Sequence, residues 1–162
     1  MTKKVNQIIG SNALVDIAGY NQVPAKIDTG ADSSSVWASN VSVSKNGILT
    51  FCLFGEKSEF YDGRKIRRKD FSVAIVRSAT GEEQVRYSTH IPVTVSGREI
   101  RAKFYLSNRS RNRFPILIGK RTILNKFLVD VSQSVVELQK SPRKKRKNLW
   151  KKFEEDPYSF HK

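Results

Sequence analysis

The chain has 162 residues, 38% of them hydrophobic, and a formal net charge of +15. It is long enough to bury the core of one domain, and no stretch approaches the roughly 18 apolar residues of a membrane span. Cys52 is the only cysteine, which excludes an intrachain disulfide, and the N-terminus lacks the apolar run of a signal peptide. We therefore expect a cytoplasmic protein with no membrane partner.

Short runs rich in β-branched and aromatic residues, separated by turns with Gly, Asn and Ser, predict eight or more strands. One helix is predicted, over Lys120–Phe127, because its apolar residues recur at helical spacing. No alternation of strands with helices is seen, so the pattern favours an all-β barrel or sandwich. The predicted strands are Val5–Ile9, Ala13–Ala18, Val23–Asp28, Ser33–Ala38, Ile48–Phe54, Phe71–Val76, Gln84–Val95, Arg98–Leu106, Phe114–Ile118 and Leu128–Leu138.

The positive charge is spread unevenly. Residues 140–162 hold nine basic and three acidic residues, and a predicted loop over Gly63–Lys69 packs five cations into seven positions. We expect a domain over residues 1–139 and a basic tail over 140–162, with little periodicity, either disordered or docked on a partner. A field of this sign attracts anions such as nucleic acid, a ribosomal surface or an acidic protein.

Residues 24–36, PAKIDTGADSSSV, carry the motif on which the functional interpretation depends. Asp28 ends an apolar approach and is followed by the small residues Thr29, Gly30 and Ala31, a pattern that suits a carboxylate held at the mouth of a tight loop. Asp28 is then either a carboxylate that activates water for attack on a peptide carbonyl or an ordinary turn aspartate. A second motif roughly ninety residues later, Ile116–Arg121, favours the first interpretation.

The two motifs, in this order, resemble the active-site loop and the late apolar strand of retropepsin-like aspartic proteases. Three segments, AKIDTGADSSSVWAS, FYLSNRSRNRFPILIGKR and FLVDVSQS, together resemble a bacterial family of this class often labelled "ATP-dependent zinc protease". Some of its members are associated with glutamate ligases that modify ribosomal proteins. The resemblance implies a retropepsin-like closed barrel with one short helix, and a peptidase with Asp28 as its catalytic acid.

The resemblance also has a point of departure. That family more usually has Arg-Thr where this chain has Asp32-Ser33. Viral retropepsins place an acid at the position of Asp32, where it contacts the substrate backbone, so the resemblance makes Asp32 a predicted substrate-binding residue.

The family label implies zinc and ATP, whereas the residues indicate acid chemistry. His90, His161 and Cys52 do not make a tetrahedral zinc site, and no HExxH helix is present. A phosphate-binding loop would need glycine in place of Phe114 and a hydroxyl residue in place of Arg121. We therefore expect no metal and no cofactor.

Aspartic proteases need two carboxylates that share one proton, and this sequence has one Asp-Thr-Gly. A second copy of the chain is the simplest source, which predicts a homodimer with Asp28 of each chain on the two-fold axis and Thr29 hydroxyls joining the loops. Within the chain, Asp130 is an alternative second acid, although no glycine follows it to build the same loop; otherwise it is a turn acid. A retained fold without proteolysis is a third outcome.

Two further features have open alternatives. Lys45–Gly47, with Asn46-Gly47 at its tip, is predicted to be a hairpin that serves either as the flap over a peptide substrate or as an ordinary surface turn. The tail combines cations with aromatic residues, which suits RNA, a ribosome or an acidic protein, or else it is a solubilising end. Its basic run consists of Arg143, Lys144, Lys145, Arg146 and Lys147.

Overall fold

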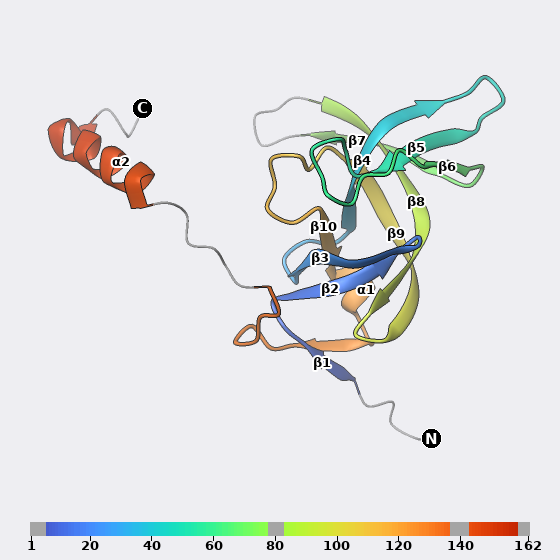
Figure 1. Cartoon of the computed structure of the whole chain (residues 1–162), viewed down its shortest axis with the longest axis horizontal. Helices are drawn as coiled ribbons and strands as arrows, with labels where there is room; N and C mark the ends of the chain where they lie inside the picture. Colours follow the sequence, from blue (N-terminus) through green and yellow to red (C-terminus); the bar gives the residue numbers. More distant parts are fainter. Residues whose placement is uncertain (1–5, 78–82, 137–142, 159–162) are drawn as a thin grey trace.

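The computed structural model describes residues 6–77, 83–136 and 143–158 (Figure 1). Strands dominate it, and two helices lie late in the chain. The elements are β1 (Gln7–Ile9), β2 (Asn12–Ile17), β3 (Tyr20–Asp28), β4 (Ser34–Val43), β5 (Leu49–Leu53), β6 (Lys65–Arg68), β7 (Ser72–Arg77), β8 (Glu83–Val95), β9 (Arg98–Ser107), β10 (Ile116–Gly119), α1 (Lys120–Ile123), β11 (Phe127–Val129) and α2 (Arg143–Glu155).

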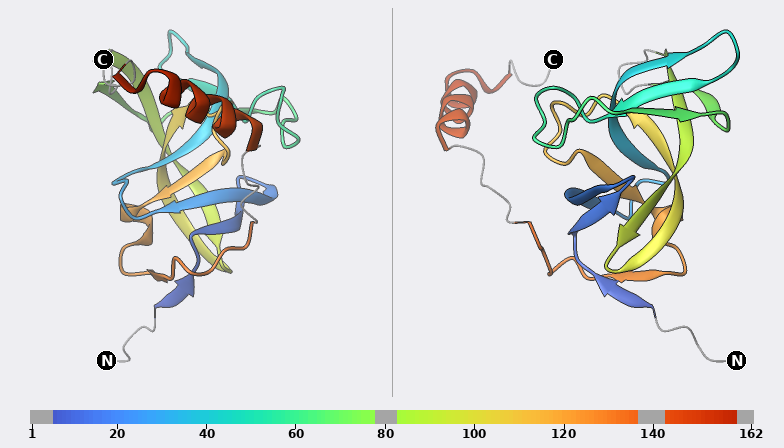
Figure 2. Two further views of the ribbon diagram at one scale, coloured as in Figure 1. Left: turned by 90° about the vertical axis from the view of Figure 1, so that its left-hand side faces the viewer. Right: turned by 45° about the vertical axis from the view of Figure 1, so that its right-hand side comes forward.

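Six strands close into a barrel, which confirms the predicted all-β fold. They follow the order β10-β3-β2-β8-β9-β4, and β4 pairs again with β10 to complete the ring. Figure 2 shows the curved strands from two further sides. Closure leaves no free edge within this ring of six strands.

The barrel is filled by alternate residues of its strands. On β9, Ile100, Ala102, Phe104 and Leu106 are buried, while Arg101 and Lys103 are exposed, as the period of two predicts. The predicted hairpin between β8 and β9 also forms. Its turn residues Ser96 and Gly97 both have positive φ, +49° and +76°, as in a type I′ two-residue hairpin turn.

Further strands extend the barrel at its margins. β5 pairs with β4 and β6 with β5, while β7 pairs with β8. β5 is almost wholly buried, as expected for a strand with apolar residues on both faces. β1 and β11 form a separate parallel pair, so the first and last strands of the body lie side by side. Within the described residues neither helix has the length and apolarity to cross a bilayer.

The structure corrects four details of the expected pattern. The basic segment Gly63–Lys69 is partly a strand, because Lys65–Arg68 pairs with β5 and buries Ile66. The helix after β10 ends at Ile123, and β11 ends at Val129 rather than continuing to Leu138. The tail, expected to lack periodicity, contains the 13-residue helix α2. Its Lys, Arg, Leu and Glu residues have high helix propensity. In the prediction from sequence, the high charge of this segment was given more importance than that propensity.

Candidate functional site

Asp28 is the last residue of β3 and lies where two parallel strands end together. β3 pairs with β10 along its second half, and Asp28 is opposite Gly119 in this register. The apolar residues before Asp28 are anchored in the core, since Val23, Ala25 and Ile27 are buried. The carboxylate is therefore presented at the end of a rigid strand, with only a quarter of its side chain exposed.

The loop after Asp28 folds back on the carboxylate. The Gly30 N–H donates a hydrogen bond of 3.1 Å to Asp28 Oδ1, and the Ala31 N–H donates one of 3.3 Å to the Asp28 carbonyl oxygen. Lys26 Nζ lies 3.2 Å from Asp28 Oδ2. Burial raises the Asp28 pKa, but the hydrogen bonds from Lys26 and Gly30 and the Lys26 charge outweigh it, so the pKa lies below its usual value.

The start of α1 holds the same loop from the other side. The Lys120 N–H donates to the Ala31 carbonyl at 2.7 Å, and the Arg121 N–H donates to the Asp32 carbonyl at 3.1 Å. Ser34 Oγ accepts the Gly119 N–H at 3.0 Å and lies 2.8 Å from Thr122 Oγ1. The middle and the C-terminal end of the Asp28 loop are thus hydrogen-bonded to the segment formed by β10 and α1.

Gly119 makes this contact sterically possible. A Cβ at this position would lie 2.5 Å from the carbonyl carbon and oxygen of Ser33 and 2.9 Å from the Ala31 oxygen. These are backbone atoms that cannot rotate away, so the late motif requires a glycine where β10 passes the loop.

The other predicted residues of the loop lie at its surface. Asp32 forms an ion pair with Lys120, with 2.7 Å between Asp32 Oδ1 and Lys120 Nζ, and this contact holds the Asp32 pKa below its usual value. Thr29 is exposed and borders a pocket that also involves Leu124 and Leu128. The structure thus brings Asp28, Thr29, Gly30, Ala31 and Asp32 together in one loop.

Arg109 is a site residue that the sequence did not reveal. It lies half-buried in the loop between β9 and β10, where its Nε donates to the Phe114 carbonyl and one terminal nitrogen donates to Ser35 Oγ at 3.1 Å. Burial lowers the pKa of the Arg109 guanidinium and the nearby Asp28 carboxylate opposes this effect. Arg109 remains charged in a folded protein, so it adds a second cation to the surroundings of Asp28.

Asp130 sits in a turn directly after β11. Its Oδ1 accepts hydrogen bonds from the Ser132 N–H and hydroxyl, and its Oδ2 accepts one from Gln133 Nε2. The Ser132 hydroxyl contributes most to keeping the Asp130 pKa below its usual value. These local contacts are those of a turn-forming acid, and its catalytic role stays a prediction.

Gly47 lies at the tip of the hairpin formed by β4 and β5. Its φ is +70° and its N–H donates to the Ser44 carbonyl at 2.9 Å, so the predicted turn is present. In Figure 1 the hairpin extends at the upper right, whereas the loop after β3 lies at the left of the barrel. Its role as a flap stays a prediction.

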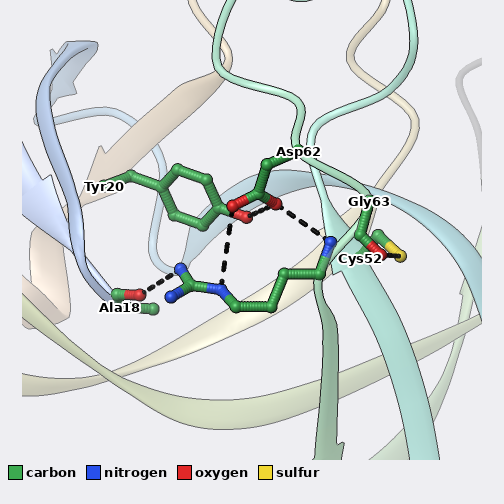
Figure 3. Close-up of polar contacts among 6 residues, drawn as sticks. Ala18, Tyr20, Cys52, Asp62 and Gly63 are labelled. Carbon is green, nitrogen blue, oxygen red and sulfur yellow. Dashed lines mark hydrogen bonds and ion pairs between the residues drawn. The ribbon is translucent and has the colours of Figure 1, made fainter.

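A second polar cluster fastens the loop between β5 and β6 to the barrel (Figure 3). The Tyr20 hydroxyl donates to Asp62 Oδ1, which also accepts the Arg64 N–H at 2.9 Å. The Arg64 guanidinium lies over the Tyr20 ring and donates to the Ala18 carbonyl at 2.7 Å. Cys52 is buried beneath this loop, with its thiol 3.5 Å from the Gly63 carbonyl oxygen. Tyr20 and Ala18 are far in the chain from Asp62 and Arg64, so no local pattern predicted these two contacts.

The remaining predicted residues bear on partners and metals. The basic run Arg143–Lys147 lies at the start of α2, and its side chains are outside the described part. Further along α2, Trp150 and Phe153 pack with ring centroids 5.5 Å apart. Across the described ranges, no group of three or more His, Cys, Asp or Glu side chains is placed to hold a metal ion.

The closed barrel, with an Asp-Thr-Gly loop held against a late apolar strand, defines the retropepsin-like class. The chain matches the family model for RimB-like proteins, described as "Retropepsin-like aspartic endopeptidase RimB", over residues 8–140. It therefore belongs to the RimB-like family.

Curated relatives and a solved structure are also similar. A probable alpha-L-glutamate ligase of Shewanella pealeana is 28% identical over 120 residues, covering 72% of this chain and 26% of the relative. The corresponding protein of Shewanella halifaxensis is 29% identical with the same coverage. The chain thus spans about a quarter of these relatives. A crystal structure of a Legionella pneumophila protein of unknown function has a TM-score of 0.61 at 24% identity, covering 80% of this chain and 97% of that protein, and supports the fold.

Proposed function

We propose that the protein is an aspartic-type peptidase that works as a homodimer, with Asp28 of each chain forming the catalytic pair. The observation that carries the proposal is the placement of Asp28. It ends a buried strand, its loop is fixed to Gly119 and Lys120, and its carboxylate remains partly open to solvent. Such a rigid mount holds an acid in the fixed geometry that hydrolysis requires.

The pair of carboxylates supplies both an acid and a base. Two unit charges about 4 Å apart repel by roughly 4 kcal/mol at an effective dielectric constant near 20. At about 1.4 kcal/mol per pKa unit, this separates the two protonations by around three units. One carboxyl stays protonated and polarises the peptide carbonyl, while the ionised one takes a proton from the attacking water.

An apolar surface beside the loop supports a second copy as the partner. Thr29 borders a pocket whose lining includes Leu124, Phe127 and Leu128. Leu124 and Leu128 are 59% and 57% exposed, and Ile8, opposite Leu128 in the β1–β11 pair, is 58% exposed. Covering these side chains with the same surface of another chain would also bring the two Asp28 loops together.

The substrate is proposed to be an acidic or glutamate-rich segment of a protein. A pocket of about 730 Å³ between the start of β8 and the β9–β10 loop is lined by Lys57, Arg86 and Arg111, with amide and hydroxyl groups and no acid. The half-buried Arg109 lies in the same β9–β10 loop and adds a cation near Asp28. The glutamate ligase names of the curated relatives agree with this chemistry.

Asp28→Asn tests the proposal. We expect the variant to fold and to lose cleavage of a glutamate-rich peptide by about 10⁴-fold or more, since the amide cannot take the proton from water. The measurement is peptide cleavage followed by mass spectrometry, and pepstatin but not a chelator should inhibit the unmodified protein. Asp130→Asn is the matched control and should retain activity. Unchanged cleavage by Asp28→Asn would reject the mechanism.

The alternative is a non-catalytic basic module on the same fold that binds RNA, a ribosome or an acidic protein. The observation that favours it is α2, where the Trp150–Phe153 pair follows the basic run and could stack on bases. Deleting residues 140–162 should then remove RNA binding, measured by fluorescence anisotropy, and leave peptide cleavage intact. Asp28→Asn should have the opposite effect.

A further inference from the structure

A small basic pocket lies on the face of β9 that carries its exposed residues, next to α1. Its volume is about 190 Å³. Four cations line it, Arg101 and Lys103 from β9 together with Arg121 and Lys126 from α1 and the turn after it, and no acid is among the lining residues. Hydroxyl groups of Ser33 and Thr122 add neutral donors.

The charges in this pocket are not neutralised by acids. In the described part of the chain, neither Arg101 nor Arg121 forms an ion pair or a side-chain hydrogen bond. Lys103 Nζ donates to the Ser72 hydroxyl at 3.2 Å and Lys126 Nζ to the Leu124 carbonyl at 3.3 Å, so their partners are neutral. The residues opposite Arg101 and Lys103 on β8 are Pro92 and His90.

Two acids lie at the margin and do not cancel this charge. Glu99 precedes Arg101 by two residues on the same face of β9 and does not line the pocket. Asp32 lies near Arg121, but its carboxylate is 2.7 Å from Lys120 Nζ, a cation outside the lining. An excess of positive charge therefore remains, together with two guanidinium groups whose planar donors match the oxygens of a bound anion.

The pocket is joined to the Asp28 loop. Thr122 in its wall lies 2.8 Å from Ser34 Oγ, which accepts the Gly119 N–H. Gly119 in turn pairs with Asp28, and the Arg121 N–H donates to the Asp32 carbonyl. A ligand that moves Arg121 towards the pocket would therefore also displace the start of α1, which is hydrogen-bonded to the Asp28 loop.

We propose that this pocket binds a phosphate-class oxyanion. A volume of about 190 Å³ lies below the roughly 300–1,000 Å³ of pockets for drug-sized ligands, which fits one tetrahedral anion group rather than a whole nucleotide. The anion is either free phosphate or the phosphate group of a small monoester. The site does not depend on peptidase activity, because its lining residues are distinct from Asp28.

The test is a titration of the full chain with inorganic phosphate or glycerol 3-phosphate at constant ionic strength, followed by NMR of the backbone amides. We expect saturable shifts at Ser34, Arg101 and Thr122 that extend to Gly119. Tighter binding of glycerol 3-phosphate would identify a monoester as the ligand, whereas preference for phosphate would identify the free ion. Shifts that grow linearly without saturation, or that centre on β6 or α2, would overturn the proposal.

Two double variants distinguish a specific anion site from the general attraction of anions to a basic protein. The double substitution Arg101→Gln/Arg121→Gln should weaken binding by about a hundredfold or more, because it removes two charged hydrogen bonds and each is worth about tenfold or more in affinity. Lys65→Gln/Arg67→Gln on β6 removes the same charge from exposed positions and should leave affinity unchanged. Equal weakening by both pairs would reject the site, and thermal unfolding of both pairs checks that they are folded.

Discussion

Lys26 and Asp28 are two residues apart on β3, so their side chains point to the same face, and the ammonium of Lys26 stabilises the ionised carboxylate. The Asp28 pKa is lowered in the folded chain. The resulting stability is present above the unfolded carboxyl pKa of about 3.9 and is lost as the pH falls through the lower folded value. At neutral pH Asp28 of the single chain is therefore a carboxylate, ready to act as the base.

Lys26→Gln should raise the Asp28 pKa towards its ordinary value, since it removes both a hydrogen bond and a positive charge. The measurement is NMR titration of the carboxyl carbon in dilute, monomeric protein. Lys120→Gln is the matched control, because its ammonium contacts Asp32, and it should leave the Asp28 titration unchanged. An Asp28 pKa that is the same in Lys26→Gln and the unmodified protein would contradict this account.

At the scale of elements, the site depends on the close passage of β10 along the Asp28 loop. Gly119→Ala should lower the free energy of unfolding by about 1–3 kcal/mol and reduce peptide cleavage, because the new Cβ meets backbone atoms at 2.5 Å. Chemical denaturation measures the change. Gly30→Ala is the contrast, since its Cβ meets only Asp28 Oδ1, at 3.4 Å, and it should cost much less stability. Equal losses for both variants would show that the passage is not tight.

These elements also show what local patterns can and cannot predict. The Asp28 loop and β10 were predictable because each is set by a short motif in which a small residue stands where backbones meet. Arg109 was not, because its approach to Asp28 depends on how the β9–β10 loop folds back. Asp62 likewise contacts Tyr20 across 42 residues. β6 was hidden by its cations: Lys65 and Arg67 are exposed and Arg68 is half-buried, while only Ile66 is fully buried.

At the scale of the whole molecule, the lowered Asp28 pKa makes formation of the proposed homodimer depend on pH. Two ionised Asp28 side chains would repel on the two-fold axis, so the dimer must take up one proton that the single chains do not hold at neutral pH. The dimer dissociation constant should therefore fall by up to about tenfold per unit decrease in pH, in the window between the upper pKa of the pair and the lower pKa of the single chain. Sedimentation equilibrium across this range measures the effect. Asp28→Asn should remove this dependence, and a dependence that survives the substitution would contradict the shared proton.

The buried thiol of Cys52 gives the chain a built-in reporter. Cys52 is the only thiol in the chain, so it is the only group that an aromatic disulfide reagent can modify. Because this thiol is buried against Gly63, the reagent reaches it in the folded protein only when the β5–β6 loop opens. Tyr20→Phe, which deletes the hydroxyl held by Asp62, should accelerate this modification by about fivefold, corresponding to the roughly 1 kcal/mol of a lost hydrogen bond. Tyr105→Phe on β9 should leave the rate unchanged. The rate of Cys52 modification, followed by absorbance, thus reports how often the β5–β6 loop opens, and no added label is needed.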